Sequence, residues 1–536
     1  MKFKMFIFAV MLGTLLTTTT TYSKAPLNLQ KIATIHGYAP GDNFGYPVKD
    51  VGDINNDGYP DLAIGYGRYP DCPDTNRVNC HRIDIYYGGA TLDTIPDITF
   101  WNALNIWGNM DLNGDGHIDL VARYTSFFDF GTIKVFLGSE SGPDTIADLS
   151  RSGEGFYHQF GREMAAGDIN ADGYDDLVVA APFDDIAAYG RVYVFFGGNP
   201  LDLEPDWYYQ SEEEFASYGE SVVCGDMNAD GYADFAVGAP FDLAEKPSRI
   251  YLYSGGDTLS IIPDYIYEAP NIDSYLGRKI EYVSDWNNSE YGLILAGWLN
   301  TEDFNGVLKL SGASEWDRFH PEVIFNTDNP HDQSFFITNA EGYFNNDSEK
   351  DILISEGLYK STRYLCYLGM SDIVNPDTLI VPGNMSNYAY YIGNAIDFND
   401  DGIDEILVIR QSYDDWTVRE FLVDIFSNNP FPVSGSAIDK DNGSIQMNGF
   451  LLEPIYPNPF NQSTIIQFTL PEASQVQLSV HDVLGREIAL LANSIYPSGI
   501  HPLRWDAEEL PSGIYVVRMT VDDNRISKIR KTVLLK

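Results

Sequence analysis

Short apolar runs alternate with polar loops from about residue 38 to residue 428, and these runs come in sets of four. The first run of a set leads into an acidic loop and the second leaves it, as Ser221–Gly225 and Phe235–Gly238 do. The third is aromatic and often ends in glycine, as Ile250–Gly256 does, and the fourth begins with a proline and an acid, as at Pro263-Asp264. Runs rich in β-branched and aromatic residues between turn residues are typical of β-strands. Each set therefore predicts a four-stranded unit.

The acidic loop between the first two strands recurs at a nearly constant spacing. It begins at positions 53, 111, 168, 226, 285, 343 and 397, in steps of 58, 57, 58, 59, 58 and 54 residues. A period this regular indicates a repeat architecture. Four short strands in each of seven repeats predict an all-β chain whose main part is a seven-bladed β-propeller, which we expect to span residues 24–428.

Five of the loops carry oxygen-bearing side chains at positions 1, 3, 5 and 9 and glycine at position 6. Ca²⁺ takes six to eight oxygen ligands, and such a loop folds back on itself to supply them. An EF-hand would need Glu at position 12 and then a helix, whereas Val179 stands there in the third loop, inside the next strand. We therefore predict about five calcium sites, each in a β-hairpin, with the ligands Asp53, Asn55, Asp57, Asp61, Asp111, Asn113, Asp115, Asp119, Asp168, Asn170, Asp172, Asp176, Asp226, Asn228, Asp230, Asp234, Asp397, Asn399, Asp401 and Glu405.

The loops that begin at positions 285 and 343 have lost parts of this pattern. The first has no glycine and carries Leu293 at position 9. The second begins with Tyr343 and has Ser348 in place of the glycine. We therefore expect calcium in repeats one to four and seven only.

The two ends of the repeat array complement each other. The last repeat has a third strand, Arg419–Phe426, but no fourth, and a strand-like segment precedes the first repeat. An open sheet edge promotes aggregation, so a ring of this kind needs closing. We expect Leu29–Ile35, within a closing segment at residues 27–37, to be the outer strand of blade seven.

The remaining segments lie outside the repeats. Met1–Ser23 has two lysines, a short apolar stretch and small residues, which is the pattern of a signal peptide. A polar linker at residues 429–450 leads to residues 451–536, where alternating strands and short turns predict a small immunoglobulin-like β-sandwich.

The repeats resemble the FG-GAP family, which includes the seven-bladed head of integrin α-chains. Phe160-Gly161 before the third loop, and Ala181-Pro182 after it, carry the resemblance, as does Gly238-Ala239-Pro240 in the fourth repeat. The resemblance implies a calcium-binding adhesion or ligand-binding module for an extracellular protein or glycan.

The C-terminal segment resembles the sorting domain of the type IX secretion system. The motif Tyr456-Pro457-Asn458-Pro459-Phe460-Asn461 and the final Leu534-Leu535-Lys536 carry this resemblance. It implies export through an outer-membrane translocon to the cell surface or the surroundings of a Gram-negative bacterium.

Charge and motifs limit the alternatives. The formal net charge of −45 argues against a nucleic-acid partner, because phosphates attract basic surfaces. The eight histidines are scattered, and no Gly-x-Ser-x-Gly, His-Glu-x-x-His or phosphate-binding glycine loop is present. We therefore expect a binding protein with no catalytic residues. The alternative is an extracellular lyase or hydrolase that acts on polysaccharides, because some calcium propellers are polysaccharide lyases.

Loops that join strands two and three should lie on the face opposite the calcium loops, because strands alternate in direction within a blade. They carry aromatic residues that could contact a ligand, namely Tyr69, Phe128, Phe183, Trp298 and Trp416. The longest loop, in blade one, holds Cys72 and Cys80, which we expect to form a disulfide in an oxidising compartment. The alternative is that the aromatics pack between blades and the disulfide only protects the loop from proteolysis.

Overall fold

The computed structural model describes most of the repeat region and most of the C-terminal segment. The described residues are 30–37, 43–69, 80–90, 92–124, 131–154, 159–183, 189–240, 246–272, 276–284, 292–297, 306–311, 320–326, 335–344, 350–358, 361–367, 377–379, 388–414, 417–427, 433–434, 451–452, 460, 463–470, 474–482, 486–496, 499–507, 510–521, 526–534 and 536. The expected signal peptide lies outside these residues. Within them the chain is all-β, and no helix could span a membrane.

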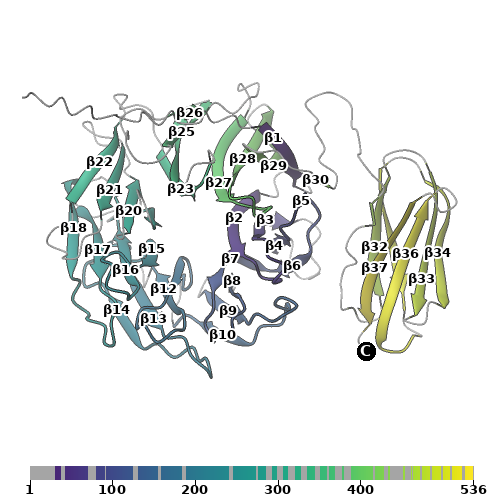
Figure 1. Cartoon of the computed structure of the whole chain (residues 1–536), viewed down its shortest axis with the longest axis horizontal. Helices are drawn as coiled ribbons and strands as arrows, with labels where there is room; N and C mark the ends of the chain where they lie inside the picture. Colours follow the sequence, from purple (N-terminus) through teal and green to yellow (C-terminus); the bar gives the residue numbers. More distant parts are fainter. Residues whose placement is uncertain are drawn as a thin grey trace, which may run out of the picture.

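Seven four-stranded antiparallel sheets follow one another around a ring, which is a β-propeller (Figure 1). Blade one contains β2 (Phe44–Gly52), β3 (Asp61–Tyr69), β4 (Cys80–Tyr86) and β6 (Ile98–Trp101). Blade two contains β7 (Ala103–Met110), β8 (Asp119–Tyr124), β9 (Thr132–Phe136) and β10 (Leu149–Ser152). Blade three contains β11 (Met164–Gly167), β12 (Asp176–Ala181), β13 (Arg191–Phe195) and β14 (Trp207–Gln210). Blade four contains β15 (Ser221–Gly225), β16 (Asp234–Ala239), β17 (Pro247–Tyr253) and β18 (Tyr265–Ile272). Blade five contains β19 (Ile280–Val283), β20 (Leu293–Gly297), β21 (Gly306–Ser311) and β22 (His320–Asn326). Blade six is β23 (Phe335–Gly342), β24 (Asp351–Leu358), β25 (Ser361–Tyr367) and β26 (Asp377–Leu379).

Blade seven takes its outer strand from the other end of the repeat region. It contains β27 (Tyr388–Ile396), β28 (Glu405–Asp414) and β29 (Thr417–Ser427), and β1 (Gln30–His36) pairs antiparallel with β29. The buried hydroxyl of Thr34 donates a hydrogen bond of 2.6 Å to the Asp424 carboxylate across this pair. The first strands of neighbouring blades also contact one another all the way round, from β2 through β27 and back to β2. The ring is therefore closed at its inner strands and within blade seven.

The Phe-Gly pair that precedes a loop fills the space between two blades. Phe160 is buried, and its ring centroid lies 5.3 Å from that of Tyr193 in an edge-to-face contact. Gly161 has a φ of +75°, and a Cβ there would lie 2.5 Å from the Ile133 side chain of blade two. A glycine is needed at this position because both the backbone conformation and the close approach exclude a larger residue.

In blades one to four, the acid that precedes the fourth strand caps the third strand of the same blade. The carboxylates of Asp97, Asp148, Asp206 and Asp264 each accept a backbone N–H bond of 2.8–3.0 Å from a residue at the end of strand three. In these blades the fourth strand begins directly after the acid. In blades one, three and four a proline precedes this acid, so the Pro-acid signal there marks the turn before the strand. In blade five, Pro321 and Glu322 lie inside β22 instead.

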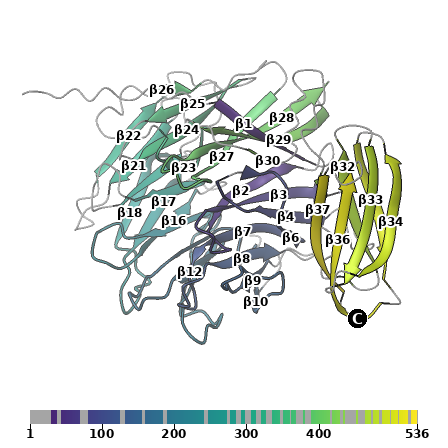
Figure 2. The ribbon, with the colours of Figure 1, turned by 45° about the vertical axis from the view of Figure 1, so that its right-hand side comes forward.

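The C-terminal segment forms two sheets around one core. One sheet has the order β31 (Leu451–Leu452), β32 (Ser463–Leu470), β35 (Gly499–Asp506), and the other has the order β34 (Glu487–Tyr496), β33 (Ser474–Asp482), β36 (Gly513–Val521), β37 (Ile526–Leu534). Phe468 and Trp505 from the first sheet share a buried cluster with Val480 and Val517 from the second. These strands form a group of their own in both views (Figure 2). The segment is thus a β-sandwich, and its immunoglobulin-like class stays a prediction.

One short connection involves the linker. β30 (Val433–Ser434) pairs in parallel with β5 (Leu92–Asp93). In the sequence, β5 comes between strands three and four of blade one. The rest of the expected linker, and the domain limits derived from the sequence, stay predictions.

Candidate metal centres

Hydrogen bonds fold each intact loop around its own side-chain oxygens. In the third loop the two Asp168 carboxylate oxygens accept the N–H groups of Asp172 and Gly173, each at 3.0 Å. The Asn170 amide oxygen accepts the Asp172 N–H at 2.9 Å, and the Asp172 carboxylate accepts the Tyr174 N–H at 3.0 Å. Each side chain at positions 1, 3 and 5 thus bonds to the backbone of the same turn, which gathers their oxygens within one loop.

The same bonds recur in all five intact loops. Their lengths are 2.7–3.2 Å in the loops that begin with Asp53, Asp111, Asp226 and Asp397. Position 6 is glycine with φ between +83° and +94°. Position 4 also has positive φ in all five loops, where it is Gly114 in the second loop and another residue in the other four. A Cβ on Gly173 would meet nothing within 4 Å, so the backbone conformation alone requires this glycine.

The acid at position 9 is buried and holds two separate backbone segments. One Asp176 oxygen accepts the Ile169 N–H at 2.8 Å, and the other accepts the Gly197 N–H at 2.7 Å. Ile169 is position 2 of the same loop, whereas Gly197 follows strand three. Burial raises the pKa of Asp176 to about 7, although these hydrogen bonds oppose the shift.

The other position-9 acids are held in the same way. Asp61, Asp119 and Asp234 are fully buried, and each accepts one N–H from loop position 2 and one from a glycine after strand three. Burial raises the pKa of Asp61 and Asp234 to about 7 and that of Asp119 to about 6. Glu405 accepts the Phe398 N–H at 3.2 Å, and burial raises its pKa to about 8.

The donor set is suited to a hard cation. Asp at positions 1 and 5 and Asn at position 3 supply oxygen only, and Ca²⁺ prefers such ligands. The described residues contain no group of three or more His, Cys, Asp or Glu side chains that could hold a metal ion by themselves. The oxygens that the intact loops gather come from carboxylates and from the Asn amide. The two loops that begin at positions 285 and 343, which have lost parts of the calcium pattern, lie largely outside the described residues.

The expected ligand face is described only in part. Phe183 follows β12, and the Arg162 guanidinium lies 5.2 Å from its ring centroid. Arg162 also forms an ion pair of 2.8 Å with Glu220. Tyr69 ends β3, where it pairs with Cys80 at the start of β4. Phe128, Trp298, Trp416 and Cys72 lie outside the described residues, so the disulfide between Cys72 and Cys80 stays a prediction.

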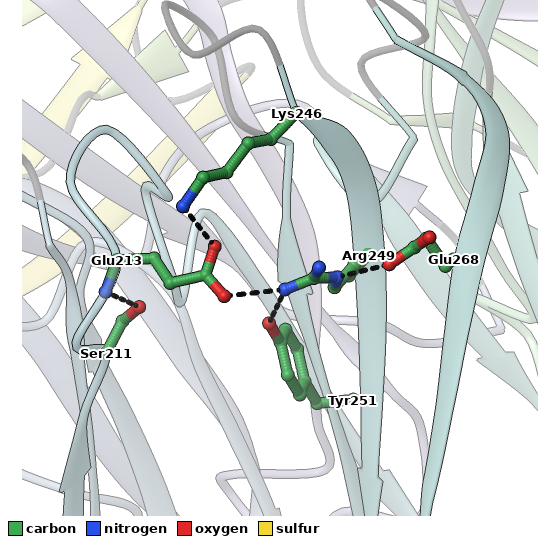
Figure 3. A network of polar contacts seen from close by, with 6 residues as sticks. All are labelled: Ser211, Glu213, Lys246, Arg249, Tyr251 and Glu268. Carbon is green, nitrogen blue, oxygen red and sulfur yellow. Dashed lines mark hydrogen bonds and ion pairs between the residues drawn. The ribbon is translucent and has the colours of Figure 1, made fainter.

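An ionic network at the start of strand three was not anticipated from the sequence. Arg249 on β17 forms ion pairs of 2.8 Å with Glu213 and Glu268, and Glu213 also pairs with Lys246 at 2.8 Å (Figure 3). Burial alone would raise the pKa of Glu213, but hydrogen bonds from Lys246 and Arg249 outweigh it and lower the pKa. Because Glu213 precedes β15 and follows β14, the network joins blades three and four.

A comparable network joins blades two and three. Arg191 on β13 pairs with Glu154 at 3.2 Å and donates a hydrogen bond of 2.7 Å to Gln210. Arg191 and Arg249 stand 58 residues apart, which is the repeat period. This spacing is the sequence signal that could have revealed the networks, because it places the same cation at the same point of two consecutive blades.

Two families of known proteins match parts of the chain. Residues 50–78, 160–195 and 218–253 match the FG-GAP repeat, and residues 454–534 match the secretion system C-terminal sorting domain. The chain therefore carries FG-GAP repeats in blades one, three and four, followed by a sorting domain of the type IX system. The sorting domain indicates secretion or display at the cell surface.

The relatives with matching repeats include integrin α-chains. Integrin alpha-5 of Xenopus laevis is 33% identical over 123 residues, which are 22% of this chain and 12% of that protein. Integrin alpha-7 of Homo sapiens is 31% identical over 175 residues, which are 31% of this chain and 14% of that protein. The chain thus spans only a small part of the length of these relatives.

Among solved structures, the chain is similar to PorZ, an essential bacterial surface component of the type-IX secretion system of Porphyromonas gingivalis. The match covers 93% of this chain and 60% of that one, with a TM-score of 0.36 and 12% identity. A likeness this distant carries no argument about the fold or function of the chain.

Proposed function

We propose that this secreted FG-GAP repeat propeller binds calcium in five loops and acts at the cell surface as an adhesion module. Its ligand would be an extracellular protein or glycan. The observation that carries the proposal is the identical internal hydrogen bonding of five loops, each of which gathers the oxygens of Asp, Asn and Asp in one turn. Kinship with integrin α-chains over the matched repeats favours binding over catalysis.

Calcium would have a structural role in this account. The acids at positions 1 and 5 repel each other in the empty loop, and a divalent cation would neutralise them and cross-link the turn. Asp at positions 1 and 5, Asn at position 3 and the backbone would hold the ion, together with the position-9 acid. Five such ions would stabilise the loops on one face of the propeller.

The ligand would bind the opposite face, where strands two and three are joined. Phe183 is half-buried there and lies beside Arg162, which is itself held by Glu220. A rigid aromatic ring next to a fixed cation supplies contact area at a low ordering cost. Residues of this kind suit either a glycan or a protein surface.

A glycan and extracellular-protein array, probed with the full chain, tests the proposed binding. We expect reproducible binding that Phe183→Ala weakens. His117→Ala, on a calcium loop, serves as the matched control and should leave binding unchanged. If His117→Ala loses binding and Phe183→Ala keeps it, the ligand binds the face of the calcium loops and the proposed binding face is wrong. If the protein binds no member of the array, the adhesion role is contradicted.

A further inference from the structure

Backbone hydrogen bonds join the loops of neighbouring blades. The Asp175 N–H donates to the Asp111 carbonyl at 3.1 Å, the Ala233 N–H to the Asp168 carbonyl at 2.9 Å, and the Asp404 N–H to the Tyr343 carbonyl at 3.0 Å. Each donor is position 8 of one loop, and each acceptor is position 1 of the loop in the preceding blade. Position 8 therefore lies against the first residue of the neighbouring loop.

At two of these junctions, position 8 is an aspartate and adds a second bond. The Asp175 carboxylate accepts the Asp111 N–H at 2.8 Å, and the Asp404 carboxylate accepts the Tyr343 N–H at 2.6 Å. Both backbone groups of the position-1 residue are then bonded to the next blade. Ala233 has no carboxylate, so its junction has the backbone bond without the side-chain bond.

The residue held by Asp175 is the one that organises the second loop. The Asp111 carboxylate accepts the N–H groups of Asp115 and Gly116 at 3.1 and 2.8 Å, and these two bonds close the turn. A shift of the Asp111 backbone would therefore move the oxygens of the whole loop. Asp175 controls that backbone from blade three.

A glycine of blade three holds the next residue of the same loop. The Gly198 N–H donates to the Leu112 carbonyl at 2.8 Å. A Cβ on the preceding Gly197 would lie 2.3 Å from the Asp175 carbonyl and 2.8 Å from the Leu112 carbonyl. This close packing leaves the junction little freedom, so the geometry at Asp175 is fixed by its surroundings.

We propose that Asp175 is a positioning residue that couples the second calcium loop to blade three. It fixes the backbone of Asp111, and through Asp111 the oxygens that would face a cation in blade two. In the same way, Asp404 holds the backbone of Tyr343, the first residue of the incomplete loop of blade six. The effect on a cation rests on the proposed calcium binding, whereas the effect on the Asp111 backbone does not.

Hydrogen exchange of the full chain, followed by mass spectrometry of the peptide that contains Asp111, tests the coupling. In excess chelator we expect Asp175→Ala to speed exchange at the Asp111 amide about tenfold, as the loss of one hydrogen bond to a charged group implies. Asp175→Asn keeps an oxygen acceptor and should remain near the wild-type rate. With calcium added, protection of this peptide should require a higher calcium concentration in Asp175→Ala than in wild type.

Ala233→Asp is the matched gain-of-function variant. The Cβ of Ala233 lies against Gly167, so an aspartate there would reach the backbone beside Asp168. We expect it to slow exchange of the peptide that contains Asp168, and it reports on the coupling even if Asp175→Ala fails to fold. Wild-type exchange at Asp111 in Asp175→Ala, or no slowing in Ala233→Asp, would overturn the proposal. If added calcium does not change hydrogen exchange in the wild-type protein, calcium binding is refuted. The effect of Asp175→Ala on exchange in chelator would remain valid in that case.

Discussion

The buried acid at loop position 9 joins the loop, strand two and the end of strand three within one blade. Asp176 shows the arrangement, with one oxygen on the loop backbone and the other on Gly197. Blade six keeps the bond to the loop backbone although its loop has lost the calcium pattern. Asp351 is fully buried there and accepts the Phe344 N–H at 3.0 Å. The acid therefore has a structural role that does not depend on a cation.

Replacing Asp351 tests this role. Asp351→Ala leaves at least one buried N–H without its acceptor, and we expect the propeller to lose about 2 kcal/mol of unfolding free energy. The loss should be the same in calcium and in chelator. Asp172→Ala, in an exposed loop of blade three, is the contrast and should destabilise the protein in calcium only. Melting curves of both variants in the two buffers decide the point, and a calcium-dependent effect of Asp351→Ala would contradict it.

Loop position 4 offers a stabilising substitution. Ala171 has a φ of +56°, a conformation that alanine adopts at a cost, whereas Asn56 occupies the equivalent position with a φ of +58°. Ala171→Asn should therefore raise the unfolding free energy by about 0.5 to 1 kcal/mol. Gly173→Ala, at φ +91°, is the converse variant and should lower it. Unfolding curves in chelator report both changes, and a lower stability of Ala171→Asn would contradict the argument.

At the scale of the element, the sequence predicted the strands and their order because each carries a local signal. The β-branched run Leu177–Ala180 lies inside β12, and the aromatic run that begins at Ile250 starts inside β17. The ionic networks escaped prediction because they depend on side chains from neighbouring blades. Arg249 meets Glu213 only after two blades have packed together. The 58-residue spacing of Arg191 and Arg249 places the two cations, but it does not record which acid each one meets.

Part of the candidate site could also be predicted. The spacing of Asp, Asn, Asp and Gly defines the turn, because its hydrogen bonds are made within seven residues. The second role of position 9 could not be predicted, since Asp176 bonds to a glycine 21 residues further along the chain. The coupling at Asp175 was missed for the same reason, because its partner lies 64 residues away.

The closing strand of blade seven makes a prediction of its own. Thr34 on β1 donates its hydroxyl hydrogen to the Asp424 carboxylate on β29, and both residues are buried. Thr34→Val removes this bond while keeping the shape, and we expect a loss of about 1–2 kcal/mol. Thr34→Ser keeps the hydroxyl and should lose less. Melting curves of the two variants test the contribution of β1, and equal stability of Thr34→Val and wild type would contradict it.

At the scale of the whole molecule, the propeller and the sandwich have separate buried cores. The sandwich core includes Phe468 and Trp505, whereas the clusters of the propeller pack between neighbouring blades. This separation suits a chain in which one part directs export and the other binds. The sorting domain is the part that the type IX system would recognise.

Removing residues 451–536 tests this division of roles. We expect the truncated chain to keep the melting transition of the propeller but to be absent from the cell surface and the medium. Cell fractionation with an antibody against the propeller measures where the chain is located. The full chain with the Asp351→Ala change, which keeps the sandwich, is the control for an effect of reduced stability on export. Normal surface display of the truncated chain would contradict the assignment of export to the sandwich.

Calcium dependence of the melting temperature tests the central claim most directly. A ligand that binds only the native state adds about 2.7 kcal/mol per site when its free concentration is 100 times its Kd. The full chain should therefore melt at a clearly higher temperature in millimolar calcium than in excess chelator, and Asp172→Ala should show a smaller difference. Identical melting curves of the wild-type protein in calcium and in chelator would contradict the account.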